Sequence, residues 1–207
     1  MLGLVLKDIL VCKKNLRQIL ILVAVFAVLG MLTRDPSFIL PIITIYFSMM
    51  VLTGFAYDAQ AKWDAYGMTM PVTRSETVLA KYLLGFVLAA SGSVLSFLLS
   101  FAYSLYQGER LNSEYVVTHL AMLGAALLII SIFIPLIYRF GVEKARLIIF
   151  LLVIIPSVGV LVLSRINIPA PSDAALRTLA TLSPFILVVW MVISYRISVG
   201  IFSKKEL

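Results

Sequence analysis

The chain has 207 residues, of which 62% are hydrophobic and only 13% are charged, with a net charge of +7. A soluble domain carries about 25% charged residues, so this composition excludes an ordinary soluble protein and predicts one embedded in a membrane. A single cysteine, Cys12, excludes a disulfide within the chain.

The first 17 residues predict a short amphipathic helix at the inner membrane surface. Its apolar side holds Leu2, Val5, Ile9 and Leu16, and its polar side holds Lys7, Lys14 and Asn15. The alternative is a cytosolic extension of the first membrane span.

Six stretches of 16 to 27 residues contain no Asp, Glu, Lys or Arg. A helix needs about 20 mostly apolar residues to cross a bilayer. We therefore predict an all-α membrane protein with six transmembrane helices in a single transmembrane domain, residues 1–207. The spans are expected at about 16–34, 37–57, 78–106, 115–138, 147–164 and 179–202.

The basic residues set the expected orientation. If both termini are cytosolic, 13 of the 17 Lys and Arg residues lie inside and four lie outside. Because basic residues favour the cytosolic side, we predict cytosolic N- and C-termini. Lys81 is counted here as part of an inside loop.

The spans offer little chemistry of their own. No charge falls inside the six stretches, which disfavours an ion-coupled carrier. We interpret His119, the only histidine, as an interfacial residue rather than a proton relay. No nucleotide-binding G-x-x-x-x-G-K-[ST] motif is present, so a transporter of this sequence needs energy from another subunit.

The third span carries one small residue in every four: Gly92, Ser96, Ser100 and Ser104. Small residues at this spacing let two helix backbones approach closely. The stripe either packs helices within the subunit or lines a translocation path or a subunit interface.

The loop after the second span is long for a simple connection. Asp58 is expected to cap a short helix through about Tyr66, which Gly67 ends. Pro71 then blocks continuation. Thr73 and Glu76 have capping-box spacing and predict the start of the third span.

Trp63 and Tyr66 are three residues apart, so they share a face of the short helix. The face is either part of the aromatic belt at a membrane surface or an anchor for a partner protein; we favour the anchor. The second inside loop, around Arg139, Glu143 and Lys144, is on its own an ordinary positive-inside loop.

Four stretches in this order resemble the small permeases of ATP-binding-cassette (ABC) exporters of the second (type-2) permease superfamily. They are "LVLKDILVCKKNLRQ", "DAQAKWDAYGMTMPVTRSETVLAKYL", "IPLIYRFGVEKAR" and the closing "SYRISVGIFSKKEL". Some such permeases are similar to exporters of phenol-soluble-modulin-type peptide toxins.

The resemblance implies a transport subunit and not an enzyme, in a bacterial-type plasma membrane. It pairs with a second copy or a paralogous permease, binds no nucleic acid, and holds no cofactor, because partner ATPase subunits in the cytosol bind ATP and Mg. The inside loops carry the coupling helices. The implied coupling residues are Asp58, Lys62, Trp63, Asp64, Tyr66, Arg74 and Glu76 in the first loop, and Arg139, Glu143 and Lys144 in the second.

The cargo implied by the resemblance is an amphipathic, antimicrobial or cytolytic peptide, or a hydrophobic compound. Two other functions remain open from the sequence. One is a membrane immunity or sensor protein that transports nothing, and the other is an ion-coupled carrier. A partner ATPase would distinguish the exporter from both.

Overall fold

The computed structural model describes residues 2–33, 40–67, 69–108, 113–148, 150–151 and 173–205. All regular structure within these residues is helical, which confirms the all-α prediction. The helices are α1 (Leu2–Lys13), α2 (Leu16–Thr33), α4 (Ile42–Gln60), α5 (Trp63–Gly67), α6 (Arg74–Gln107), α7 (Ser113–Phe140) and α9 (Asp173–Ser203).

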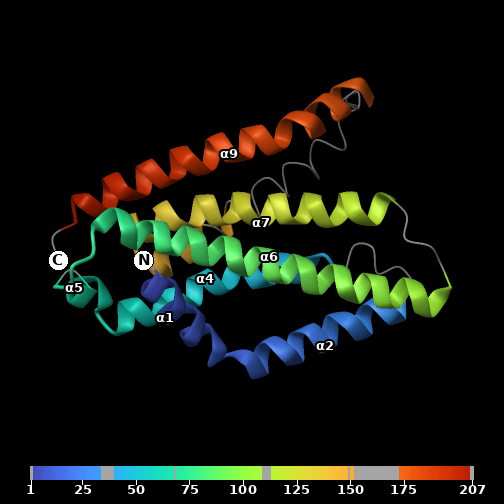
Figure 1. Ribbon diagram of the computed structural model, residues 1–207, viewed down its shortest axis with the longest axis horizontal. Helices are drawn as coiled ribbons and strands as arrows, with labels where there is room; N and C mark the ends of the chain where they lie inside the picture. Colours follow the sequence, from blue (N-terminus) through green and yellow to red (C-terminus); the bar gives the residue numbers. More distant parts are fainter. Residues whose placement is uncertain are drawn as a thin grey trace.

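The long helices run along the length of the molecule, and α5 lies at one end of it (Figure 1). The start of α1, the end of α7 and the end of α9 lie at this same end, on the left of the view. We call it the α5 end. α6 is the central helix and packs against α4, α7 and α9.

Four helices of the described part are long and apolar enough to cross a membrane: α4, α6, most of α7 and the second part of α9. α1 and α2 are bent by 65° relative to each other and make a fifth candidate if they form one span. Four of the expected spans therefore coincide with such helices, and the first coincides with α2. The fifth, 147–164, lies mostly outside the described residues.

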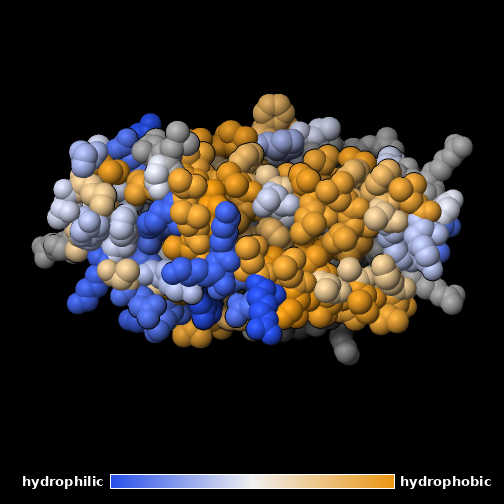
Figure 2. Space-filling view, turned by 60° about the horizontal axis from the view of Figure 1, so that its bottom comes forward, coloured by the Kyte–Doolittle hydropathy of each residue, from blue (hydrophilic) through white to orange (hydrophobic). Residues whose placement is uncertain are grey.

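The surface agrees with this assignment. Figure 2 shows a broad apolar surface over the middle of the molecule, the most hydrophilic residues toward the left, the α5 end, and weakly hydrophilic residues at the right end. α2 and α9 contribute many exposed aliphatic side chains, including Leu20, Leu32, Ile186 and Val188. Apolar surface of this extent is typical of a protein whose solvent is lipid.

The core between the long helices is aliphatic, with Ile43, Leu84, Ile130 and Ile134 almost fully buried. Toward the α5 end it becomes aromatic. The Tyr138 ring at the end of α7 lies 5.3 Å from Phe55 of α4 and 4.9 Å from Phe202 of α9. These rings join the ends of three helices beneath α5 and give that end a fixed base.

Hydrogen bonds add to this packing on the α9 side. The Tyr82 hydroxyl of α6 lies 2.5 Å from Ser194 Oγ and 3.0 Å from Ser198 Oγ of α9. The Ser194 hydroxyl in turn donates to the Ser131 carbonyl of α7. Because such buried groups find no water, these bonds fix how α9 lies against α6 and α7.

Candidate functional site

α5 is a short helix set between two abrupt changes of chain direction. α4 ends at Gln60, and Lys62 adopts a left-handed conformation with φ of 49° before α5 begins. After Gly67 the described chain is not helical until Arg74, where α6 starts. Pro71 lies in this break, where the sequence predicted it.

The start of the short helix differs from the prediction. Asp58 does not cap it, because α4 continues through Asp58 to Gln60 and α5 begins only at Trp63. Asp58, which was expected to serve as the cap, is 8% exposed, and its carboxylate is used in tertiary ion pairs instead. The predicted end at Gly67 is correct.

Asp58 belongs to a buried ion-pair cluster formed by Lys7 and Asp8 of α1, Asp58 of α4 and Lys81 of α6. Lys81 Nζ lies 2.8 Å from Asp8 Oδ2 and 2.5 Å from Asp58 Oδ2. Lys7 Nζ lies 2.5 Å from Asp58 Oδ1, and 3.0 Å from Asp8 Oδ1 in a direction that does not suit a hydrogen bond. The two cations and two anions leave the cluster with no net charge.

The burial of Lys81 corrects the prediction that places it in an inside loop. It is 4% exposed, in the second turn of α6, and its amine also lies 4.9 Å from the centre of the Phe55 ring. Asp8 is only 1% exposed. The cluster therefore joins α1 to the helix that leads into α5 and to the helix that follows it.

The aromatic face of α5 is present as predicted. The Trp63 and Tyr66 ring centres are 5.5 Å apart. Lys7 Nζ lies 4.1 Å above the Trp63 ring, a cation–π contact that ties α5 to α1. Tyr66 is the more accessible of the two, with 57% of its surface exposed.

The end of α9 holds α5 and the start of α6 from the other side. Arg74 Nη1 donates to the carbonyls of Phe202 (2.9 Å), Ser203 and Lys205 (3.3 Å). These carbonyls lie at and just beyond the C-terminal end of α9, where a cation is favourable. Lys205 Nζ lies 2.8 Å from Asp64 Oδ2 of α5.

We call α5 with its three holding residues, Lys7, Arg74 and Lys205, the α5 platform. Lys7 reaches it from α1, and Lys205 from the residues just after α9. Arg74 is thus directed at the protein's own backbone. Lys62, just before α5, and Tyr66, within it, remain exposed. They are therefore the accessible members of the coupling residues predicted for the first inside loop.

The capping box at the start of α6 is confirmed. The Thr73 hydroxyl accepts a bond of 3.2 Å from the Glu76 N–H, and Glu76 Oε2 accepts one of 2.9 Å from the Thr73 N–H. Glu76 precedes the apolar part of α6, and the bond from the Thr73 N–H is the main reason that its pKa lies below the ordinary value, with the Thr73 hydroxyl adding to the effect.

Removing this capping box by Thr73→Ala with Glu76→Ala is expected to loosen the joint between the α5 platform and α6. Losing an N-cap costs about 1 kcal/mol, which is too little to unfold the protein. Hydrogen exchange of residues 74–80 should quicken, while exchange in the centre of α6 stays unchanged. Ser113→Ala, at the start of α7, is the control variant. Equal exchange in the double variant and the wild type would show that the box contributes no rigidity.

The second predicted loop lies at the same end of the molecule. α7 ends at Phe140, and Gly141, with φ of 80°, interrupts the helix before helical residues 142–148. Arg139 packs against the Phe140 ring, and Glu143 and Lys144 are exposed. The two predicted loops are thus brought to one end, although no described ion pair joins Arg139, Glu143 or Lys144 to α5.

The structure places the small-residue stripe of α6 inside the subunit. Gly92, Ser96, Ser100 and Ser104 are all buried. At Gly92 the backbones of α6 and α4 approach so closely that a Cβ would lie 2.6 Å from Phe47 Cβ. Ser100 faces α7, with its Oγ 3.2 Å from His119 Nε2.

The sequence suggested that His119 is an interfacial residue. The structure instead buries it between α6 and α7, with 3% of its surface exposed. Its Nδ1 lies 2.7 Å from the Tyr115 carbonyl oxygen. A ring nitrogen must donate to a carbonyl, so Nδ1 carries a proton and a neutral ring would accept from Ser100 at Nε2. Among the described residues, no group of three or more His, Cys, Asp or Glu is arranged to hold a metal ion.

Sequence reasoning missed the buried ion-pair cluster and the contacts of the end of α9. A signal for the cluster was present in the sequence. Two basic and two acidic residues, Lys7, Lys81, Asp8 and Asp58, flank three apolar segments at the ends that are predicted to lie on the same side of the membrane. The Arg74 contacts left no such signal, because backbone carbonyls 128 to 131 residues away carry no sequence pattern.

Comparison with known protein families places most of the chain within one family model. Residues 3–203 match the model of a protein family described as ABC-2 family transporter protein. No curated protein and no solved structure matches the chain.

Proposed function

Because the chain belongs to the ABC-2 family of transporter proteins, we propose that it is the membrane-spanning permease subunit of an ATP-driven exporter. A separate cytosolic ABC ATPase docks on the α5 platform, and that ATPase binds ATP and Mg and performs the hydrolysis. The observation that carries the proposal is the platform itself, an exposed aromatic helix held rigidly between α1, α6 and the end of α9.

A docking helix must transmit force, and the contacts of α5 are suited to that. Lys7 contacts Trp63, and Lys205 pairs with Asp64. The capping box and Arg74 fix the start of α6 directly behind α5. Movement of α5 would therefore be carried into α1, α6 and α9 together.

The proposed membrane arrangement has six spans with both termini and α5 in the cytosol of a bacterial-type plasma membrane. The 13-to-4 distribution of basic residues supports this orientation. α7 and α9 both run toward the α5 end (Figure 1), which supports a further crossing between them. Two copies, or this chain with a paralogous permease, would complete the transporter.

The proposed cargo is an amphipathic peptide of the antimicrobial or cytolytic kind, including the phenol-soluble-modulin type, or a hydrophobic compound. Such cargo is itself partly dissolved in the bilayer. That fits a chain whose described helices expose apolar side chains along most of their length. The residues of the second loop, Arg139, Glu143 and Lys144, would form a second contact with the same ATPase.

Tyr66 provides the test of docking. Tyr66→Ala is expected to weaken binding of the co-expressed ATPase by about 2 kcal/mol, roughly 30-fold, because exposed aromatic anchors dominate such interfaces. Trp63→Ala added to it should weaken binding further, since the Trp63 ring lies next to the Tyr66 ring. Binding is measured by microscale thermophoresis of purified permease against ATPase.

The matched control is Tyr106→Ala, which removes an exposed tyrosine at the opposite end of α6 and should leave binding unchanged. If Tyr66→Ala binds the ATPase as tightly as the wild type, α5 is not the docking element. A wild-type chain that binds no ATPase at all would favour the immunity or sensor function over export.

A further inference from the structure

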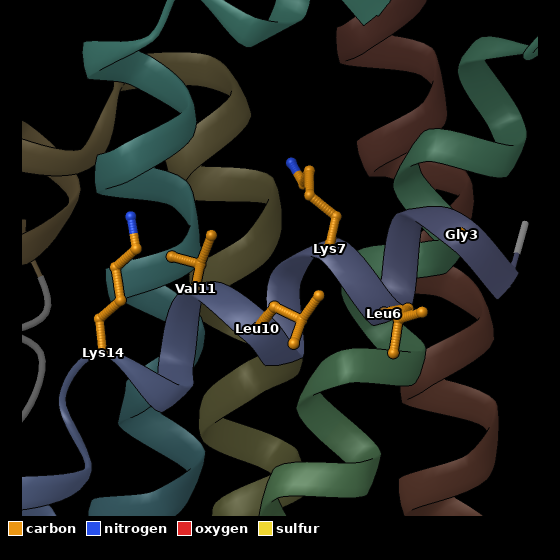
Figure 3. Close-up of a pocket in the computed structure, with 6 residues that line it drawn as sticks. All are labelled: Gly3, Leu6, Lys7, Leu10, Val11 and Lys14. Carbon is orange, nitrogen blue, oxygen red and sulfur yellow. The ribbon is translucent and has the colours of Figure 1, made fainter.

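A shallow groove of about 390 Å³ follows the outer side of α1. It is lined by Gly3, Leu6, Lys7, Leu10, Val11 and Lys14 (Figure 3). In the close-up α1 crosses in front of the long helices, and Lys7 and Lys14 extend to one side of it while Leu6 does not. The groove therefore has an apolar floor, and the Lys7 amine at its edge is already paired with Asp58.

The leucine side of this groove is not packed against the rest of the fold. Asp8 and Cys12 turn toward the bundle and are buried. Leu6 and Leu10 turn away from it and are 57% and 51% exposed. The sequence pattern assigned Lys7 to the polar face, but its amine turns back to Asp58 and Trp63. What remains outward is a leucine surface followed along the chain by cations.

Those cations are Lys13, Lys14 and Arg17, at the bend of 65° between α1 and α2. All three are exposed, and none pairs with a carboxylate of the described residues. Asp8 is the one acidic residue in the first 33 positions, and it is buried and occupied by Lys81. The charge of this surface is therefore positive and uncompensated, directly beside apolar side chains.

We propose that this surface binds one anionic phospholipid of the adjoining leaflet. Its phosphate would lie among Lys13, Lys14 and Arg17, and one acyl chain would cover Leu6 and Leu10. A phospholipid supplies in one molecule the negative charge and the apolar chain that the two halves of the surface require. The border of apolar and hydrophilic residues on the side that carries α1 and α2 is visible in Figure 2.

Because of the position of α1, a lipid bound to it would affect the α5 platform as well as anchor α1 to the membrane. Through Asp8 and Lys7, α1 is tied to Asp58 and Lys81 at the two ends of the α5 loop. Because a lipid on the outer face holds α1 against the bundle, it also holds the cation–π contact of Lys7 with Trp63. The lipid composition of the membrane would then act on the α5 platform. This consequence, unlike the lipid site itself, rests on the proposed function.

The test measures lipid selectivity of the whole protein in phosphatidylcholine bilayers. Trace spin-labelled phosphatidylglycerol or phosphatidylcholine is added, and electron paramagnetic resonance gives the fraction of label immobilised by the protein. A basic residue near anionic lipid contributes roughly fivefold to binding, so we expect at least about tenfold preference for phosphatidylglycerol. Lys13→Gln with Lys14→Gln and Arg17→Gln should abolish it.

The matched control is Arg146→Gln with Arg196→Gln and Lys204→Gln, which removes the same charge from other exposed positions and should keep the preference. Equal immobilisation of both lipids by the wild type, or equal loss in both triple variants, would overturn the site. Displacement of the label by inorganic phosphate at fixed ionic strength would assign the cations to a soluble anion and also overturn it.

A second measurement needs no variant. Phosphatidylglycerol with a photoreactive acyl chain is reconstituted with the wild-type chain and cross-linked, and the adducts are mapped by mass spectrometry. Adducts concentrated on Leu6 and Leu10 support the site, whereas adducts spread evenly over the spans contradict it. Both measurements use bilayers with the same lipid in each leaflet, so they do not depend on the proposed orientation or on an ATPase.

Discussion

Lys81→Met is expected to lower the free energy of unfolding by about 3–5 kcal/mol, the usual cost of removing one partner from a buried ion pair. Methionine fills a similar volume, so the loss arises from charge and not from a cavity. It leaves Asp8 and Asp58 buried with only Lys7 to compensate them. Chemical unfolding in detergent, followed by circular dichroism, measures the change.

Two further variants separate the cluster from a general effect of losing a lysine. Lys204→Met removes an exposed lysine and should change stability by less than about 0.5 kcal/mol. Lys81→Met combined with Asp58→Asn should recover part of the loss, because the excess negative charge is removed with it. If Lys81→Met unfolds like Lys204→Met, the ion pairs contribute nothing to stability.

Gly92→Leu is expected to destabilise the protein by about 3 kcal/mol, the upper part of the range for overpacked positions. A Cβ at Gly92 would lie 2.6 Å from Phe47 Cβ and 3.2 Å from Thr44 Cα. The second of these atoms is backbone, so α4 and α6 must separate to admit a side chain. Yield of monodisperse protein and the same unfolding experiment report the effect.

Gly124→Leu is the matched control, because a Cβ at Gly124 meets no atom within 4 Å. Leucine also favours a helix over glycine by up to about 1 kcal/mol, so this variant should be as stable as the wild type or slightly more so. A Gly92→Leu protein that matches it would mean that the close approach of α4 and α6 is easily relaxed.

The helices and the capping box could be predicted from the sequence because their causes are local. Thr73 and Glu76 need only each other's side chains and backbone N–H groups. The apolar stretches need only their length. The break at Pro71 likewise follows from one residue that cannot continue a helix.

The prediction fails where a side chain has a distant partner. Aspartate is a typical helix-capping residue, but the Asp58 carboxylate pairs instead with Lys81, 23 residues away, and with Lys7, 51 residues away. A lysine at position 81 is expected to be exposed in a loop, but two carboxylates and the Phe55 ring allow Lys81 to be buried. Local propensity carries no information about such pairings.

The contacts of Arg74 with the end of α9 also set an order of events during synthesis. Arg74 and the Lys205 carbonyl that it binds are separated by 131 residues. At about 5–20 residues per second, the ribosome needs roughly 7–26 seconds to make that interval. During this time α5 exists without the ion pair of Asp64 and without the Arg74 bonds. Until Lys205 has been synthesised, α5 therefore lacks its contacts with the end of α9. A partner that recognises α5 with these contacts in place can bind only chains whose translation has passed Lys205.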